Sequence, residues 1–222
     1  ACAEGKMTTR AFNKKQSQAG SGFQRRSARV MTSDTHGPYP MSVDSKRYWT
    51  SLTCKDTGRV FSAETKTRGQ IAEEIQLKLK TTARVSTGDC VELRHDATSD
   101  YCKLIPYLRE EGIEEVKTGP YSSAENGHAE RTGRGINAKT RCLLSFSGIP
   151  VQFWTYALRH AVWLHNRTPR QVQKKWITPI AEFEGHQAVT QSLTNKLPIF
   201  GQLGHVLVPK QLRQSTMHKV ST

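Results

Sequence analysis

Three acidic residues of this chain stand where a folded protein could gather them around metal ions. Asp34 closes the segment ARVMTSD, Asp96 closes DCVELRHD, and Glu130 lies in PYSSAENGHAER, which opens a helical pattern. Mg²⁺ binds a few carboxylate oxygens and keeps its other positions for water and substrate phosphates. Two such ions about 3.5–4 Å apart stabilise both the attacking and the leaving oxygen of a phosphoryl displacement. These residue types therefore suit two-metal phosphoryl transfer.

The choice of the two aspartates stays open when only spacing is considered. Asp89 and Asp100 compete with Asp96, and Asp56 competes with Asp34, because each lies close to the end of an expected strand. Any α/β domain of this size offers several acids in such places. Convergence of three carboxylates from separate elements is what would distinguish a metal site from ordinary surface charge.

The helix that carries Glu130 is expected to begin at Ser123, because Ser122 followed by Glu125 matches a capping box. Without acidic partners, Glu130 would be one more solvated charge on a basic helix. On a helix that approaches phosphates, a lone carboxylate repels them unless a cation lies between. Helical spacing places Ser123, Asn126, Arg134, Asn137 and Arg141 on the face of Glu130, and Ile136, Thr140, Leu143 and Leu144 on a core-facing stripe.

The segments that must position these acids alternate between strand and helix patterns. Runs rich in β-branched and aromatic residues predict strands, and apolar residues at every third or fourth position predict helices. The resulting order predicts an α/β fold, in which a mixed five-stranded sheet is flanked by helices. Strands are expected at 28–34, 47–54, 56–63, 89–96 and 113–119, and helices at 68–83, 101–112, 123–146 and 151–166.

The charge of the chain favours a polyanionic partner. The 222 residues include 33 Lys and Arg against 19 Asp and Glu, which gives a net charge of +14. Such a surface suits nucleic acid better than an anionic membrane. No apolar run approaches the roughly 20 residues of a membrane span. The five cysteines, an odd number without a CxxC pair, indicate a reducing compartment rather than a disulfide framework.

Three blocks of the chain resemble the signature blocks of a known enzyme family. They are MTSDTHGPYP, LRHDATSDY and GPYSSAENGHAERTGRGINAKTRCLL. Together they resemble the integrase core of copia-type LTR retrotransposons, a DDE polynucleotidyl transferase with a ribonuclease H-like fold. The segments SGIPVQFWTYALRHAVWLHNRTP and PIFGQLGHVLVPKQLR resemble the downstream part of that family. The resemblance covers nearly the whole chain in the order of the family, which identifies it as a fragment of a Gag-Pol polyprotein.

The resemblance implies a role for each matched position. Asp34, Asp96 and Glu130 would be the catalytic and metal-binding triad, holding Mg²⁺ or Mn²⁺ in a two-metal site. The implied activity is 3′-end processing of element DNA followed by strand transfer into target DNA, which is DNA integration. Element-end DNA and target DNA are the expected partners, together with a homo-oligomer of the chain and no membrane. Contacts to DNA are expected from Asn126, Arg131, Arg134 and Lys139.

The resemblance also divides the chain. Residues 1–23 would be the end of a zinc-binding region and a linker, 24–187 the catalytic core, and 188–222 a basic extension with one or two further strands. Cys2 would be the remnant of a zinc motif whose other ligands lie upstream, so zinc is not expected in this fragment. The implied location is intracellular, in the nucleus or a cytoplasmic particle.

Several features differ from the family pattern, among them the turn after Asp96 and two glycines in the helix after Glu130. The turn after Asp96 is ATSD, without the usual glycines, and Gly133 and Gly135 stand where helix formers are expected, at a cost of roughly 1 kcal/mol each relative to alanine. An alternative hypothesis is therefore a catalytically decayed, nucleic-acid-binding relic of the same fold. A nuclease of this fold without strand transfer is a third.

Overall fold

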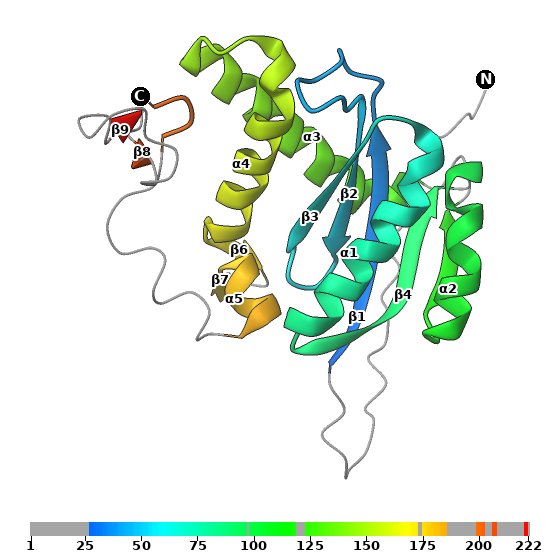
Figure 1. Ribbon diagram of the computed structural model, residues 1–222. Coiled ribbons are helices and arrows are strands. Elements are labelled where there is room, and N and C mark those ends of the chain that lie inside the picture. The colour runs from blue at the N-terminus through cyan, green and yellow to red at the C-terminus, as the bar shows by residue number, and fades with distance from the viewer. Residues whose placement is uncertain are drawn as a thin grey trace, which may run out of the picture.

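A mixed five-stranded sheet forms the centre of the protein (Figure 1). The computed structural model describes residues 27–96, 98–118, 123–172, 175–185, 199–202, 206–207 and 220–221. The sheet has the order β3-β2-β1-β4-β5, with β1 antiparallel to β2 and parallel to β4. This confirms the predicted fold class. The strands are β1 Ser27–His36, β2 Tyr48–Cys54, β3 Val60–Thr65, β4 Gly88–Asp96 and β5 Glu114–Thr118.

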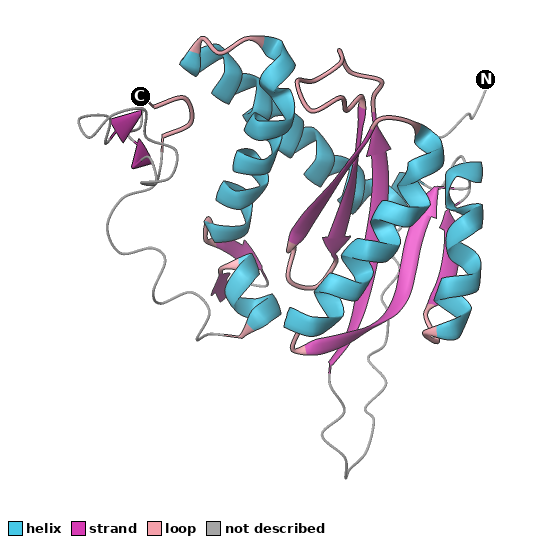
Figure 2. Ribbon diagram, in the orientation of Figure 1, coloured by secondary structure: helices cyan, strands magenta, loops and turns pink. Residues whose placement is uncertain are grey.

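Helices cover both faces of this sheet, as the colouring by secondary structure makes plain (Figure 2). Helices α1 and α2 lie in front of the strands in Figure 1, and α3 passes behind them with α4 packed against it. The helices are η1 Arg68–Gln70, α1 Ile71–Val85, η2 Ser99–Leu104, α2 Ile105–Glu110, α3 Ser123–Ser147, η3 Val151–Phe153, α4 Trp154–Arg167 and α5 Pro179–Glu184.

Alternation along the strands divides the core into two clusters. Because successive side chains of a strand point to opposite faces, Leu52 and Cys54 of β2 pack with α1 and α2, whereas Trp49 of the same strand packs with α3 and α4. On β1, Met31 belongs to the α1 side. Asp34, three residues later, therefore faces the α3 side of the sheet.

A bulge in β4 changes which of its residues face inward. Arg29 pairs with Cys90 and Val30 with Glu92, so Val91 is the extra residue and lies 40 % exposed. Both Cys90 and Leu93 can thus pack against the same core cluster. The bulge therefore turns Cys90, and not Val91, toward the core beside Leu93.

Several boundaries differ from the sequence prediction. The expected strand 56–63 begins only at Val60, because residues 55–57 form a turn that returns through Gly58 with a φ of 69°. The expected helix 101–112 is a 3₁₀ turn followed by α2. The short hairpin of β6 Arg170–Val172 and β7 Lys175–Ile177, and helix α5, were not predicted. Elements of three to six residues are too short to show a period.

The ends of the chain are described only in part. Residues 1–26, which include the expected linker, and most of 186–222 lie outside the described residues. In the expected extension, β8 Val206–Leu207 pairs with β9 Val220–Ser221. None of the helices in the described ranges has the length and apolar character needed to cross a membrane.

Candidate metal centre at the ends of β1 and β4

Asp34 and Asp96 lie side by side on adjacent parallel strands. Thr32 of β1 pairs with Arg94 of β4, so the residue two positions further on each strand is again a neighbour. Neighbouring strands are about 4.8 Å apart, and residues two positions apart share a face. Leu93 belongs to the α1 side of the core, so Asp96 faces the α3 side, as Asp34 does. The two carboxylates therefore stand together where both strands end.

Glu130 joins these aspartates from helix α3, on the same side of the sheet. Burial raises the pKa of Asp34 from its ordinary value of 3.8 to about 6, and repulsion by the carboxylates of Asp96 and Glu130 adds to this rise. Burial also raises the pKa of Asp96. Both carboxylates are thus near enough for their charges to act on Asp34, although burial is the larger cause of the raised pKa. Asp34 and Asp96 are neighbours on adjacent strands and Glu130 acts on Asp34 from α3, while the role of the three acids as a metal-binding triad stays a prediction.

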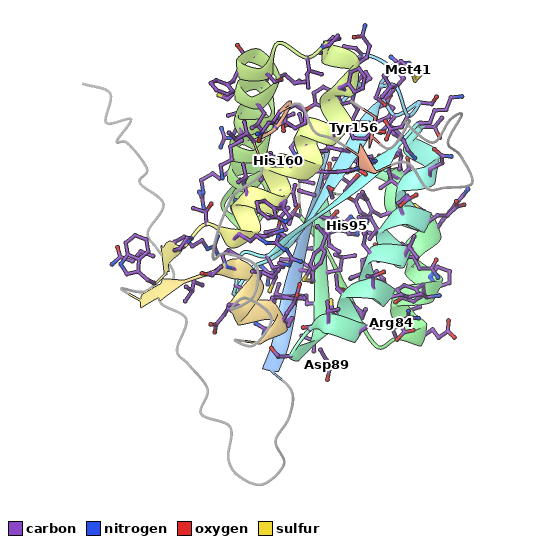
Figure 3. All side chains as sticks on the ribbon, turned by 60° about the vertical axis from the view of Figure 1, so that its left-hand side comes forward. Met41, Arg84, Asp89, His95, Tyr156 and His160 are labelled. Atoms are coloured by element: carbon purple, nitrogen blue, oxygen red, sulfur yellow. The ribbon has the colours of Figure 1, made fainter. Side chains whose placement is uncertain are left out.

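The competing acids lie elsewhere or are already paired. Asp89 is at the start of β4, far below His95 in Figure 3, and Asp56 lies exposed in the turn between β2 and β3. Both are therefore at the opposite end of the sheet. Asp100 accepts hydrogen bonds from Arg68, with 2.6 Å between Nη2 and Oδ2.

The carboxylates have the properties of an incomplete cation site. Oδ1 of Asp96 is buried without a hydrogen-bond partner among the described residues, and the carboxylates of Asp96 and Glu130 both repel that of Asp34. A divalent cation would satisfy both conditions, because it supplies positive charge and binds carboxylate oxygen. Within the described ranges, no three His, Cys, Asp or Glu side chains are already arranged closely enough to enclose a metal ion. The three carboxylates suit a divalent cation, and binding of the cation would have to bring them closer to one another.

A buried polar layer supports the two aspartates from the α1 side. The Tyr101 hydroxyl lies 2.7 Å from Ser33 Oγ, and its ring stacks on His95 at 4.0 Å between centroids. His95 is fully buried, with Nδ1 2.7 Å from the Asp96 carbonyl oxygen and Nε2 3.1 Å from Glu115 Oε1. Both partners of the ring nitrogens are oxygen atoms, one of the backbone and one of a carboxylate. This layer was not predicted from the sequence, since its residues come from four elements, β1, β4, η2 and β5.

His36 is a second residue that sequence analysis did not assign to the site. Its ring stacks on Trp49 at 4.7 Å, and its Nε2 lies 3.5 Å from Asp34 Oδ2. Burial lowers the pKa of His36 to about 4, so the ring is neutral at pH 7 and forms no ion pair with Asp34. Nε2 makes no hydrogen bond to any described residue. The contact between His36 and Asp34 is thus one of packing.

Asn137 faces inward, which corrects its expected place among the solvent-facing polar residues. Its Oδ1 accepts hydrogen bonds from Trp49 Nε1 at 3.0 Å and from the Tyr39 hydroxyl at 3.2 Å. Asn137 is only partly exposed. The core-facing stripe was placed correctly, since Ile136 and Thr140 are buried. The edge of a helical face cannot be assigned from periodicity, because a polar residue there can turn either way.

The residues expected to contact DNA are distributed around α3. Arg131, Arg134 and Lys139 are exposed. At about 100° per residue, Arg134 lies roughly 40° from Glu130 around the helix, whereas Lys139 lies about 180° away. Asn126 lies in the first turn of α3, and its side chain is outside the description, as are Ser122 and the expected capping box. The DNA contacts of these residues stay predictions.

A cavity lined by residues of α3 and α4 does not include Asp34, Asp96 or Glu130 in its wall. It has a volume of about 200 Å³ and a mostly apolar wall, formed by Tyr39, Pro40, Asn137, Thr140, Arg141, Leu144, Val151, Trp154 and Leu158.

Cys2 lies outside the described residues. The described cysteines, Cys54, Cys90, Cys102 and Cys142, are free thiols.

Comparison with curated proteins finds homologues among plant transposons. The chain is 29 % identical over 193 residues to a retrovirus-related Pol polyprotein from transposon TNT 1-94 of Nicotiana tabacum, covering 83 % of this chain and 14 % of the polyprotein. It is 32 % identical over 109 residues to that from transposon RE1 of Arabidopsis thaliana, covering 48 % of this chain and 7 % of the polyprotein. No protein-family model matches the chain.

Solved structures with a similar fold include retroviral integrases. The intasome of simian T-cell lymphotropic virus, in complex with the PP2A regulatory subunit B56 gamma, aligns with a TM-score of 0.56 and 18 % identity, over 89 % of this chain and 67 % of that chain. The catalytic core domain of BIV integrase aligns with a TM-score of 0.51 and 14 % identity, over 73 % and 94 %. The chain is thus similar in sequence to part of these retrovirus-related Pol polyproteins, and its fold is that of the integrase catalytic core.

Proposed function

We propose that this chain is the catalytic core of a retrotransposon integrase, a polynucleotidyl transferase that processes the 3′ ends of element DNA and joins them to target DNA. The observation that supports the proposal most directly is the placement of Asp34 and Asp96 at the ends of adjacent parallel strands, with the carboxylate of Glu130 on α3 near enough to repel Asp34. Homology to Pol polyproteins and the shared integrase fold support it. The chain spans 14 % of the tobacco relative, so the activity proposed concerns this domain.

The three carboxylates would hold Mg²⁺ or Mn²⁺, and the bound ions would stabilise charge on the oxygens of the transferring phosphate. The fold of the protein holds the three carboxylates in place. The strands β1 and β4 fix Asp34 and Asp96, while Glu130 comes from a helix of 25 residues packed behind the sheet. Exposed Arg131 and Arg134 would bind DNA phosphates beside the acids, which sets the register of the duplex without reading bases.

The partners proposed are element-end DNA and target DNA, with a second copy of the chain to act on the second element end. We further propose that the protein acts in the nucleus or in a cytoplasmic particle, because the proposed activity needs access to element DNA. Copia-type ancestry fits the quoted sequence blocks and is part of the proposal.

A strand-transfer assay tests the proposal. The unmodified protein is incubated with Mn²⁺, a duplex that carries an element end, and a target duplex, and joined products are resolved on a denaturing gel. We expect product, and we expect Asp96→Asn and Glu130→Gln to abolish it while DNA binding is retained or strengthened, because each change removes a negative charge. Asp56→Asn, in the turn at the opposite end of the sheet, is the matched control and should leave product unchanged.

Each other outcome assigns a different function. Nicked element DNA without joined product would indicate a nuclease of this fold. No reaction at all, with salt-sensitive DNA binding intact, would contradict the enzyme and indicate a nucleic-acid-binding relic.

A further inference from the structure

We propose that His36 and Gly133 form a matched pair that positions the metal-binding acids: the His36 ring fills a notch in α3 that exists because residue 133 has no side chain. The pair would set the separation between Asp34 on β1 and Glu130 on α3. His36 and Gly133 are positioning residues, and the proposal rests on the proposed function of the three acids.

Atoms of His36 occupy the space that a side chain at position 133 would need. A Cβ built on Gly133 would lie 2.6 Å from His36 Cε1 and closer still to Nε2. Real Cβ atoms do not approach other atoms so closely, so either the ring or the helix would have to move. Gly133 has an ordinary helical backbone, and the reason for glycine is therefore space. In a helix interior, glycine is otherwise unfavourable relative to alanine.

The His36 ring is held too firmly to move aside. It is stacked on Trp49, and the Trp49 indole donates a hydrogen bond to Asn137 on α3. His36 is mostly buried, with its side chain 16 % exposed. The ring is therefore enclosed by β1, β2 and α3, and an added methyl group would displace the helix or break the stack.

Glu130 lies on neighbouring turns of α3 with Gly133, which contacts His36, and Asn137, which contacts Trp49. Glu130, Gly133 and Asn137 follow one another at spacings of three and four residues, so they lie near one side of the helix. A shift of α3 at Gly133 therefore moves Glu130, one turn away. On the strand side, His36 is two residues beyond Asp34 and on the same face. The separation between the two acids depends on how closely α3 approaches His36.

Gly135 provides a matched control for the test. It lies in the same helix two residues later, it is exposed, and nothing outside the helix lies within 4 Å of a Cβ built on it. Gly135→Ala should raise the melting temperature and leave Mn²⁺ affinity unchanged. Gly133→Ala makes the same chemical change but should lower the melting temperature and weaken Mn²⁺ binding, measured by calorimetry without DNA, by roughly 10-fold to 100-fold.

A double-mutant cycle separates positioning from general damage. His36→Ala alone should weaken Mn²⁺ binding moderately, and in that background Gly133→Ala should have no further effect, because the notch is empty. In the strand-transfer assay, Gly133→Ala should raise the Mn²⁺ concentration for half-maximal rate more than it lowers the rate at saturating Mn²⁺. A loss of folded protein would lower the saturating rate instead.

The inference is overturned if Gly133→Ala behaves as Gly135→Ala does, or if the effects of His36→Ala and Gly133→Ala on Mn²⁺ affinity simply add. Failure of the proposed function looks different, since the unmodified protein would then bind no Mn²⁺ and join no DNA. In that case the melting temperatures of the four variants still decide whether His36 occupies the notch.

Discussion

At the scale of single residues, the ionisation of Asp34 opposes folding at neutral pH. Its carboxyl is buried beside two other acids, and its pKa of about 6 lies well above the ordinary value of 3.8. A group whose pKa is raised by folding stabilises the protein below its unfolded pKa, and this stability is lost as the pH rises through its folded pKa. Above about pH 6, the charged carboxylate of Asp34 therefore lowers the free energy of unfolding of the metal-free protein.

We expect Asp34→Asn to stabilise the metal-free protein at pH 7.5. A rise of about two pKa units corresponds to about 2–3 kcal/mol in the free energy of unfolding, and the gain should vanish near pH 4. Urea denaturation in a chelating buffer at both pH values measures it, with exposed Asp56→Asn as control. A destabilising effect of Asp34→Asn at pH 7.5 would show that the charged carboxylate has a stabilising partner.

The affinity for Mn²⁺ should fall as the carboxylate of Asp34 becomes protonated. Because a cation competes with the proton for Asp34, the apparent affinity for Mn²⁺ should fall as the pH is lowered from 7.5 through 6. Calorimetric titration at several pH values measures this fall. An affinity that is constant from pH 7.5 to 5.5 would mean that Asp34 does not bind the ion.

At the scale of elements, α4 closes the open edge of the sheet. Strand β3 is one of the two edge strands of the five-stranded sheet, and its Val60 N–H and C=O point away from β2. Asn166, buried at the end of α4, accepts from the Val60 N–H and donates to the Val60 C=O, both at 2.8 Å. A side chain thus satisfies the backbone groups that would otherwise be available for pairing with another chain.

Removal of the Asn166 side chain should destabilise the protein strongly. Asn166→Ala leaves a donor and an acceptor of Val60 without partners beneath α4, so we expect a loss of about 2–4 kcal/mol in the free energy of unfolding. Ser145→Ala, at an exposed position of α3, should change it by less than about 0.5 kcal/mol. Denaturant unfolding measures both, and equal small effects would mean that the edge contact contributes little.

At the scale of the whole molecule, the excess of basic residues should govern DNA binding. The net charge of +14 predicts an affinity for duplex DNA that falls steeply with salt and shows little base preference. Arg134, close to Glu130 around α3, would contribute to the footprint. Arg84, labelled in Figure 3 at the end of α1, belongs to the opposite layer.

Arg134→Ala should therefore reduce the slope of log affinity against log salt by about 1, and Arg84→Ala should leave it unchanged. Fluorescence anisotropy with a labelled duplex, between about 50 and 200 mM salt, measures the slope. An equal effect of both substitutions would mean that DNA does not approach the protein on the α3 side.

Much of the architecture follows from local pattern. The strand around Met31, the aromatic hairpin strand around Trp49 and the long helix that begins at Ser123 were each predicted within a few residues. Their periods repeat often enough to separate strand from helix. The short hairpin at 170–177 and α5 were missed, because so few residues carry no period and their stability comes from packing.

The sequence by itself determined the candidate acids, the basic surface and the order of strands and helices. Only the tertiary structure decided which acids meet. The bulge at Val91 shifts the alternation of β4 and turns Asp96 toward α3, and a one-residue shift of this kind is invisible in a pattern of period two. Likewise Gly133, which costs helix stability when considered locally, is required by His36 from a strand about 100 residues earlier. Contacts between such distant segments exist only once the chain has folded.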